Sequence, residues 1–166
     1  MYMIPFGVPF IVSSAGAAVT VEWVPVSEPV EPGDVLELDP ENSGCYRRAR
    51  QPCSTSVAGV VFTISGFVPG SSPATNRPLQ TTHHVLPTTH YPSATDSTLL
   101  ALFGIVPVKV TDESGPIHPG DLLMASSTPG YAMRWDRNSG EPCAFVGKAL
   151  GPLEGEKGVL PVLLVP

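Results

Sequence analysis

The sequence predicts an all-β protein, in which two related antiparallel sheet units form a sandwich or a barrel and are preceded by an extended N-terminal arm. First, 20 Pro and 16 Gly among 166 residues leave little room for long helices. Second, the chain is 42% hydrophobic but only 7% aromatic, so Val, Leu, Ile and Ala must supply most of the core, as is typical of strands. Third, the turn Pro32-Gly33-Asp34 recurs as Pro119-Gly120-Asp121.

The two turns belong to a longer internal repeat. The first copy contains Val24-Pro25-Val26, Pro32-Gly33-Asp34, Tyr46-Arg47, Pro52-Cys53 and Val57-Ala58-Gly59-Val60, and the second contains Val106-Pro107-Val108, Pro119-Gly120-Asp121, Tyr131 with Arg134, Pro142-Cys143 and Val146-Gly147-Lys148-Ala149. Each copy is interpreted as a strand, a Pro-Gly-Asp turn, a strand, a looser Gly turn and a closing strand. The chain then divides into an arm (1–20), a first β unit (21–64), a loop (65–98) and a second β unit (99–166).

The Pro-Gly-Asp turns have a structural and a chemical interpretation. Pro presets φ, Gly tolerates positive φ, and Asp34 or Asp121 can accept hydrogen bonds from nearby backbone amides. If the two aspartates met across a pseudo-twofold axis, they could instead share a proton for acid-base work. Capping explains both with fewer assumptions, and we prefer it.

Aliphatic runs bounded by turn residues place the remaining strands. They are expected directly after each Pro-Gly-Asp turn and at 19–26, 57–64, 99–110, 144–150 and 159–165. Pro107 and Pro161 cannot donate to a ladder, so their strands are expected at a sheet edge or at a bulge.

The first twelve residues are apolar, and two prolines keep them extended. An apolar strip of this length needs another surface to cover it, and a neighbouring subunit is the natural one. The predicted assembly arm consists of Met1, Tyr2, Ile4, Phe6, Val8, Phe10, Ile11 and Val12. The prolines and the lack of a preceding Lys or Arg argue against a membrane span or an ordinary signal peptide.

The loop at 65–98 is rich in Pro, Ser and Thr and contains three of the four histidines. It is interpreted as a solvated excursion, a contact arm or a glycan-bearing segment. His83, His84 and His90 are the candidate metal ligands, although no carboxylate or thiolate stands at ligand spacing. We therefore expect no metal and no cofactor.

Three cysteines cannot all pair within one chain. They are interpreted as buried thiols, with a Cys45–Cys53 bridge as the alternative. Cys53 and Cys143 are expected at matched, well-separated positions of the repeat, and so unbonded to each other.

No catalytic motif is present, and no catalytic residue is assigned. Arg47 and Arg134, matched in the repeat, are interpreted as surface groups at strand ends, with anion binding as the alternative. Trp23 and Trp135 are too far apart in sequence to suggest a sugar platform. A net charge of −6 argues against a nucleic-acid partner.

One part of the chain resembles a known class of module. The residues that carry the resemblance are Val106-Pro107-Val108-Lys109-Val110, Gly115-Pro116-Ile117, Pro119-Gly120-Asp121-Leu122-Leu123, Ser126-Ser127-Thr128-Pro129-Gly130-Tyr131-Ala132-Met133 and Gly147-Lys148-Ala149-Leu150. They resemble a β-rich C-terminal module of bacterial secreted proteins and phage tail-fibre or appendage proteins, whose relatives resemble self-cleaving trimerisation chaperones. The resemblance covers 99–166 and, less closely, 24–62, and the chain is more loosely similar to phage capsid-decoration proteins.

The resemblance implies an assembly role on a particle or fibre, and it transfers no cleavage nucleophile to this chain. We expect a non-enzymatic, self-assembling structural protein of a virion appendage, capsid surface or extracellular filament. Its expected partners are copies of itself, with other virion or cell-surface proteins as further candidates, and its expected location is extracellular or on a virion. The alternatives are an autoproteolytic trimerisation module and a carbohydrate- or surface-binding module.

Overall fold

The computed structural model describes residues 10–14, 17–63, 97–140 and 142–165. These ranges contain ten β-strands, a short 3-10 turn at Arg137–Ser139 and no α-helix, so the predicted all-β class is confirmed. The strands are β1 (Phe10–Ser14), β2 (Ala17–Pro25), β3 (Val35–Leu38), β4 (Tyr46–Arg48), β5 (Val57–Phe62), β6 (Ser97–Thr111), β7 (Leu122–Ala125), β8 (Ala132–Arg134), β9 (Phe145–Ala149) and β10 (Lys157–Leu164).

The C-terminal strands close into a five-stranded barrel. The order of pairing is β10-β9-β7-β8-β6, and β6 pairs again with β10. One link, Val110 to Ala132 between β6 and β8, is parallel, and the others are antiparallel. Val108, Leu123 and Val162 are fully buried, as expected of strands whose alternate side chains fill a small barrel.

The N-terminal strands repeat this scheme. β2, β6, β5, β3 and β4 pair in that order, and a single parallel bridge from Val26 to Tyr46 closes the ring. A separate cluster of buried side chains, Val24, Val26, Leu36, Val61 and Leu100, forms part of its core. We call the two rings the first barrel and the second barrel.

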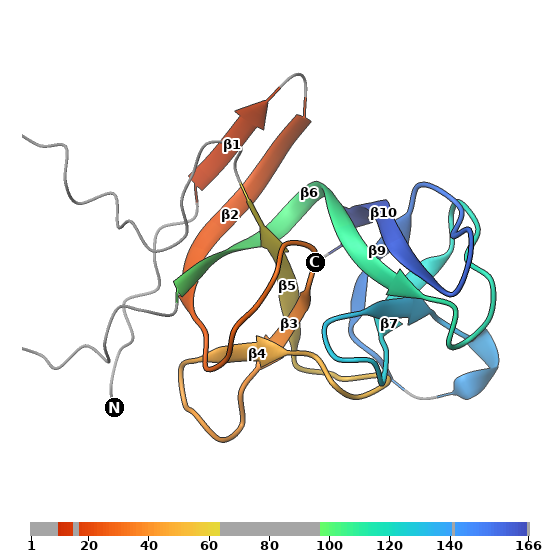
Figure 1. Cartoon of the computed structure of the whole chain (residues 1–166), viewed down its shortest axis with the longest axis horizontal. Coiled ribbons are helices and arrows are strands. Elements are labelled where there is room, and N and C mark those ends of the chain that lie inside the picture. The colour runs from red at the N-terminus through yellow and green to blue at the C-terminus, as the bar shows by residue number, and fades with distance from the viewer. Residues whose placement is uncertain (1–9, 15–16, 64–96, 141, 166) are drawn as a thin grey trace, which may run out of the picture.

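The two barrels share one strand. Figure 1 shows β6 running from the lobe of β2–β5 to the lobe of β7–β10. Residues Ser97–Phe103 of β6 pair with β2, whereas Gly104–Thr111 pair with β10. Gly104 has φ +119°, and a Cβ there would lie 2.6 Å from the carbonyl oxygen of Ala18. The crossover between the barrels therefore requires glycine.

The repeat is visible in the backbone hydrogen bonds of the two Pro-Gly-Asp turns. The matched bonds are Gly33 N to Val61 O (2.9 Å), Val61 N to Asp34 O (2.9 Å), Gly120 N to Ala149 O (2.7 Å) and Ala149 N to Asp121 O (2.9 Å). The register shifts at equivalent places, between Leu36 and Glu37 and between Leu123 and Met124. The same local structure is thus built twice.

Three of the sequence matches were out of register, among them Tyr46, whose counterpart is Ala132 and not Tyr131. The parallel bridges align Val26 with Val110. The counterpart of Val24-Pro25-Val26 is therefore Val108-Lys109-Val110, two residues further along the chain than the sequence match. Arg134 pairs with Leu123 as Arg48 pairs with Leu36, so Arg48, not Arg47, is its counterpart.

The expectation for the two prolines was also wrong. Pro107 and Pro161 lie opposite each other in the middle of the β6–β10 ladder, in a closed barrel and with an unbroken register. The carbonyl oxygen of Pro161 accepts from Leu150 N, on the side away from β6. The amide and the carbonyl of a strand residue point to the same side of the strand, so the position of the missing N–H of Pro161 faces away from β6. The β6–β10 ladder therefore loses no hydrogen bond to the prolines.

Part of the predicted arm belongs to a hairpin. β1 pairs antiparallel with β2, from Phe10 with Val21 to Ser14 with Ala17, and the hairpin extends beyond the first barrel in Figure 1. The side chain of Ile11 is exposed. Met1, Tyr2, Ile4, Phe6 and Val8 lie outside the described residues.

Candidate functional site

The two aspartates of the repeat cap their own turns. Asp34 Oδ2 accepts from Glu31 N at 2.8 Å, and Asp121 Oδ2 accepts from His118 N at 2.8 Å. Their surroundings differ, because Asp34 is buried and its Oδ1 lies 2.9 Å from Lys109 Nζ. Asp34 therefore joins the first barrel to the second through an ion pair as well as shaping its turn.

Backbone hydrogen bonds reinforce this junction. Lys109 N donates to Gly33 O at 2.9 Å, Val35 N donates to Gly130 O at 2.8 Å, and Gly130 N donates to Ala49 O at 2.9 Å. Gly130 has φ +79°, and a Cβ there would lie 2.6 Å from Asp34 Oδ1. The turn at Gly130 of the second barrel is thus closely seated against β3 of the first.

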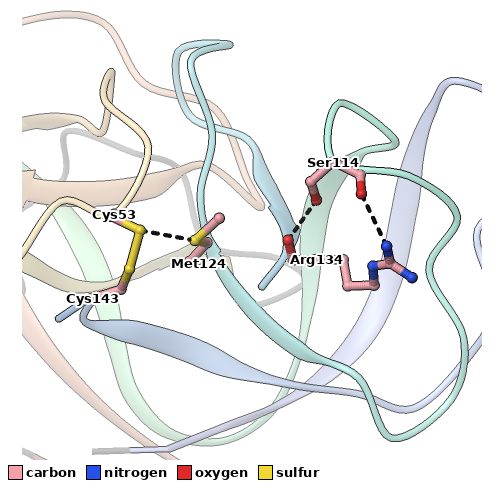
Figure 2. The surroundings of a disulfide bond; sticks show 5 residues. All are labelled: Cys53, Ser114, Met124, Arg134 and Cys143. Carbon is pink, nitrogen blue, oxygen red and sulfur yellow. Dashed lines mark hydrogen bonds between the residues drawn. A yellow bond between two sulfur atoms is a disulfide. The ribbon is translucent and has the colours of Figure 1, made fainter. Parts of the chain in front are cut away.

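A disulfide also joins the barrels, contrary to the sequence prediction. Cys53 and Cys143 are bonded, whereas Cys45 is a free, half-buried thiol. Figure 2 shows the bond beside Met124, whose Sδ lies 3.3 Å from Cys53 Sγ. Both cysteines precede strands that contact each other, β5 and β9. Their similar positions in the repeat therefore bring them together at the junction instead of separating them.

The arginines and tryptophans have local structural contacts. Arg47 Nε donates to Glu37 Oε1 at 3.1 Å, and Arg134 donates to the carbonyl oxygen of Ser114 at 3.1 Å, as Figure 2 shows. Trp135 meets Phe145 edge to face at 5.2 Å between ring centroids, whereas Trp23 packs against the main core.

The proposed metal ligands His83, His84 and His90 lie outside the described residues. Among the residues that are described, no group of three or more His, Cys, Asp or Glu side chains could hold a metal ion. Nor does this part of the chain contain a helix long and apolar enough to cross a membrane.

An apolar groove of about 460 Å³ lies between the barrels. It is lined by Val57, Ala58, Gly59, Leu102, Leu122, Cys143, Ala144, Phe145, Val146, Leu164 and Val165, none of them charged. Phe145 and Val165 are 37% and 42% exposed. We call this feature the junction groove and treat it as the candidate functional site.

Sequence reasoning did not identify the junction groove. Val57, Leu102 and Leu164 lie in strands whose apolar residues look like ordinary core residues. The groove exists because two barrels meet at an angle around β6, and no local pattern encodes that angle.

The chain is similar in fold to a phage protein of known structure. No family model matches this sequence, and no curated protein matches it. Among solved structures, the chain resembles the C-terminal fragment of gene product 12 of bacteriophage phi29, with a TM-score of 0.52 and 18% sequence identity. The likeness covers 87% of this chain and 99% of that fragment. The two share a fold, and the β-rich architecture of this chain therefore occurs in a phage protein.

Proposed function

We propose that this chain is a non-enzymatic structural protein that assembles with copies of itself in a virion appendage, on a capsid surface or in an extracellular filament. The observation that carries the proposal is the uncharged junction groove. The fold shared with a phage gene product supports the virion setting. A location on a virion or outside the cell is part of the proposal.

The charge of the chain limits where a second copy can bind. With a net charge of −6, two copies repel each other overall. The groove lining contributes nothing to this repulsion and offers apolar area, including the partly exposed Phe145 and Val165. Burying such area gains about 25 cal/mol per Å², so association is favoured at this face.

Placing charges in the groove tests the proposal. Ala144→Lys combined with Val165→Lys changes two lining residues outside the buried core. We expect the full chain to sediment as an oligomer and the double variant as a folded monomer. Val159→Lys, at an exposed residue away from the groove, is the matched control and should still assemble. A monomeric wild-type chain, or an oligomer that survives the double variant, would contradict this interface.

The N-terminal arm is a second proposed contact between copies. Deleting residues 1–14 removes most of the arm, including β1, and leaves β2 and both barrels in the chain. Unchanged circular dichroism with a smaller sedimentation coefficient would support the arm as an assembly element. Loss of the circular dichroism signal would instead assign β1 to the fold.

A further inference from the structure

A second pocket, of about 310 Å³, lies on the first barrel. Its lining includes Glu37, Leu38, Arg47, Gln51, Ser54 and Ser56. We call it the polar pocket, because its lining is mainly polar and charged side chains. Its volume is at the lower end of the range of about 300–1,000 Å³ that is usual for small-molecule sites.

The centre of the polar pocket is a buried carboxylate with ordered partners. Glu37 is 3% exposed, and its Oε1 accepts from Arg47 Nε at 3.1 Å. Its Oε2 accepts from Ser54 Oγ at 2.7 Å, and Ser54 Oγ lies 3.1 Å from Ser56 Oγ. A carboxylate oxygen accepts more than one hydrogen bond and a guanidinium has five donor hydrogens, so the group keeps capacity for a ligand.

The repeat indicates that folding does not require these charges. Glu37 and Arg47 are cross-strand partners in β3 and β4, and the equivalent partners in β7 and β8 are Met124 and Met133. The same position in the same architecture is therefore filled by an apolar pair in the second barrel. A buried ion pair is often no more stabilising than an apolar pair of similar size. The charges in the first barrel thus point to a role other than folding.

We propose that the polar pocket binds a neutral sugar through two adjacent hydroxyl groups. A sugar hydroxyl can donate to the carboxylate of Glu37 and accept from Arg47 or a serine hydroxyl. Leu38, 51% exposed, offers an apolar surface for the carbon face of the ring. Asp39 Oδ1 lies 3.9 Å from Arg47 Nη1, so two carboxylates surround one guanidinium and disfavour an acidic sugar. This inference goes beyond assembly and is independent of the junction groove.

The test replaces the charged pair with the pair used in the second barrel. The methyl glycosides of glucose, galactose and mannose would be titrated into the full chain by saturation-transfer NMR, with glucuronate as an acidic probe. We expect at least one neutral glycoside to bind with a Kd of about 1 mM or tighter. The double variant Glu37→Met with Arg47→Met should be at least as stable in urea and bind at least tenfold more weakly.

Glu28→Gln is the matched control, because Glu28 pairs with Arg48 in the same barrel but does not line the pocket. It should retain sugar binding. The proposal is overturned if no neutral glycoside binds the full chain, if the double variant binds equally well, or if glucuronate binds more tightly than every neutral probe. A double variant that is less stable than wild type would show that the pair serves the fold, and would also overturn it.

Discussion

Gly59 and Gly147 occupy equivalent bulges of the two barrels, and each lies against a backbone carbonyl oxygen of the neighbouring strand. A Cβ at Gly59 would lie 2.3 Å from Ala101 O, and a Cβ at Gly147 would lie 2.3 Å from Leu163 O. The register shifts opposite both glycines. The repeat has therefore kept glycine where the strands approach too closely for a side chain.

Alanine at either position should destabilise the fold. Gly59→Ala and Gly147→Ala are each expected to lower the free energy of unfolding by about 2–3 kcal/mol, because backbone atoms must move to admit the methyl group. Urea denaturation measures this change. Gly151→Ala is the control, since its nearest non-neighbouring atom would be 3.9 Å away, an ordinary contact. Equal effects at all three glycines would contradict the steric argument.

The sequence predicted most of the strands for a physical reason, although it did not predict β1, β4 or β8. Pro-Gly-Asp turns and aliphatic runs are local signals, and the strands after Asp34 and Asp121 formed where those signals stood. The match of Val24-Pro25-Val26 was two residues out because strand side chains alternate with a period of two. A slip of two residues keeps the same side chains inside, so composition alone does not fix the alignment.

Features that depend on docking could not be predicted in this way. The Cys53–Cys143 disulfide and the junction groove arise from the way the two barrels meet. The shared use of β6 was likewise hidden, since residues 99–110 form one apolar run whose halves have different partners. Glu37 and Arg47 are ten residues apart, and only the pairing of β3 with β4 brings them together.

The disulfide should make a large contribution to stability. It closes a loop with a sequence separation of 90 residues. Replacing both Cys53 and Cys143 with Ala should lower the free energy of unfolding by about 2–4 kcal/mol, mainly because the unfolded chain regains freedom. Urea denaturation of the double variant and the oxidised wild type measures the difference.

A thiol count checks the connectivity independently. The unfolded, unreduced chain should expose one reactive thiol, that of Cys45. Cys45→Ser should abolish that signal and leave the urea midpoint nearly unchanged. Three reactive thiols would show that the bond is absent from the purified protein.

The two capping aspartates should differ in their contributions. Asp121→Ala removes a turn cap and is expected to reduce stability by about 1 kcal/mol. Asp34→Ala also removes the buried partner of Lys109, which keeps its ion pair with the exposed Glu31, and should reduce stability by about 2 kcal/mol. Thermal and urea unfolding of both variants would reveal the difference. Similar losses would mean that the ion pair across the junction contributes little beyond the cap.

Acid should destabilise the fold through Glu113. Burial would raise the pKa of this carboxyl, but hydrogen bonds from the backbone and side chains of Ser127 and Thr128 outweigh it and place the pKa below the ordinary 4.5. A group with a lowered pKa stabilises the folded state above its unfolded pKa and loses that contribution as pH falls through the folded pKa. Stability should therefore decrease as pH falls below about 4.5.

The contribution of this carboxyl can be isolated by substitution. Glu113→Gln should reduce the loss of stability between pH 7 and pH 3 by about 0.5 kcal/mol, a small effect because solvent screens the group. Urea denaturation at the two pH values gives this difference. An acid-induced loss that is the same in wild type and variant would assign the pH dependence to other carboxyls.

Sharing β6 also makes the duplication difficult to reverse. Two copies joined by a linker can be separated again by recombination, and each can then evolve alone. Here a break within Ser97–Thr111 would remove one strand from a barrel, because β6 is a strand of both barrels. The two copies must therefore be inherited together. Side chains at equivalent positions, such as Glu37 and Met124, can still differ between the copies. The backbone of the shared strand cannot change in one barrel without changing the other.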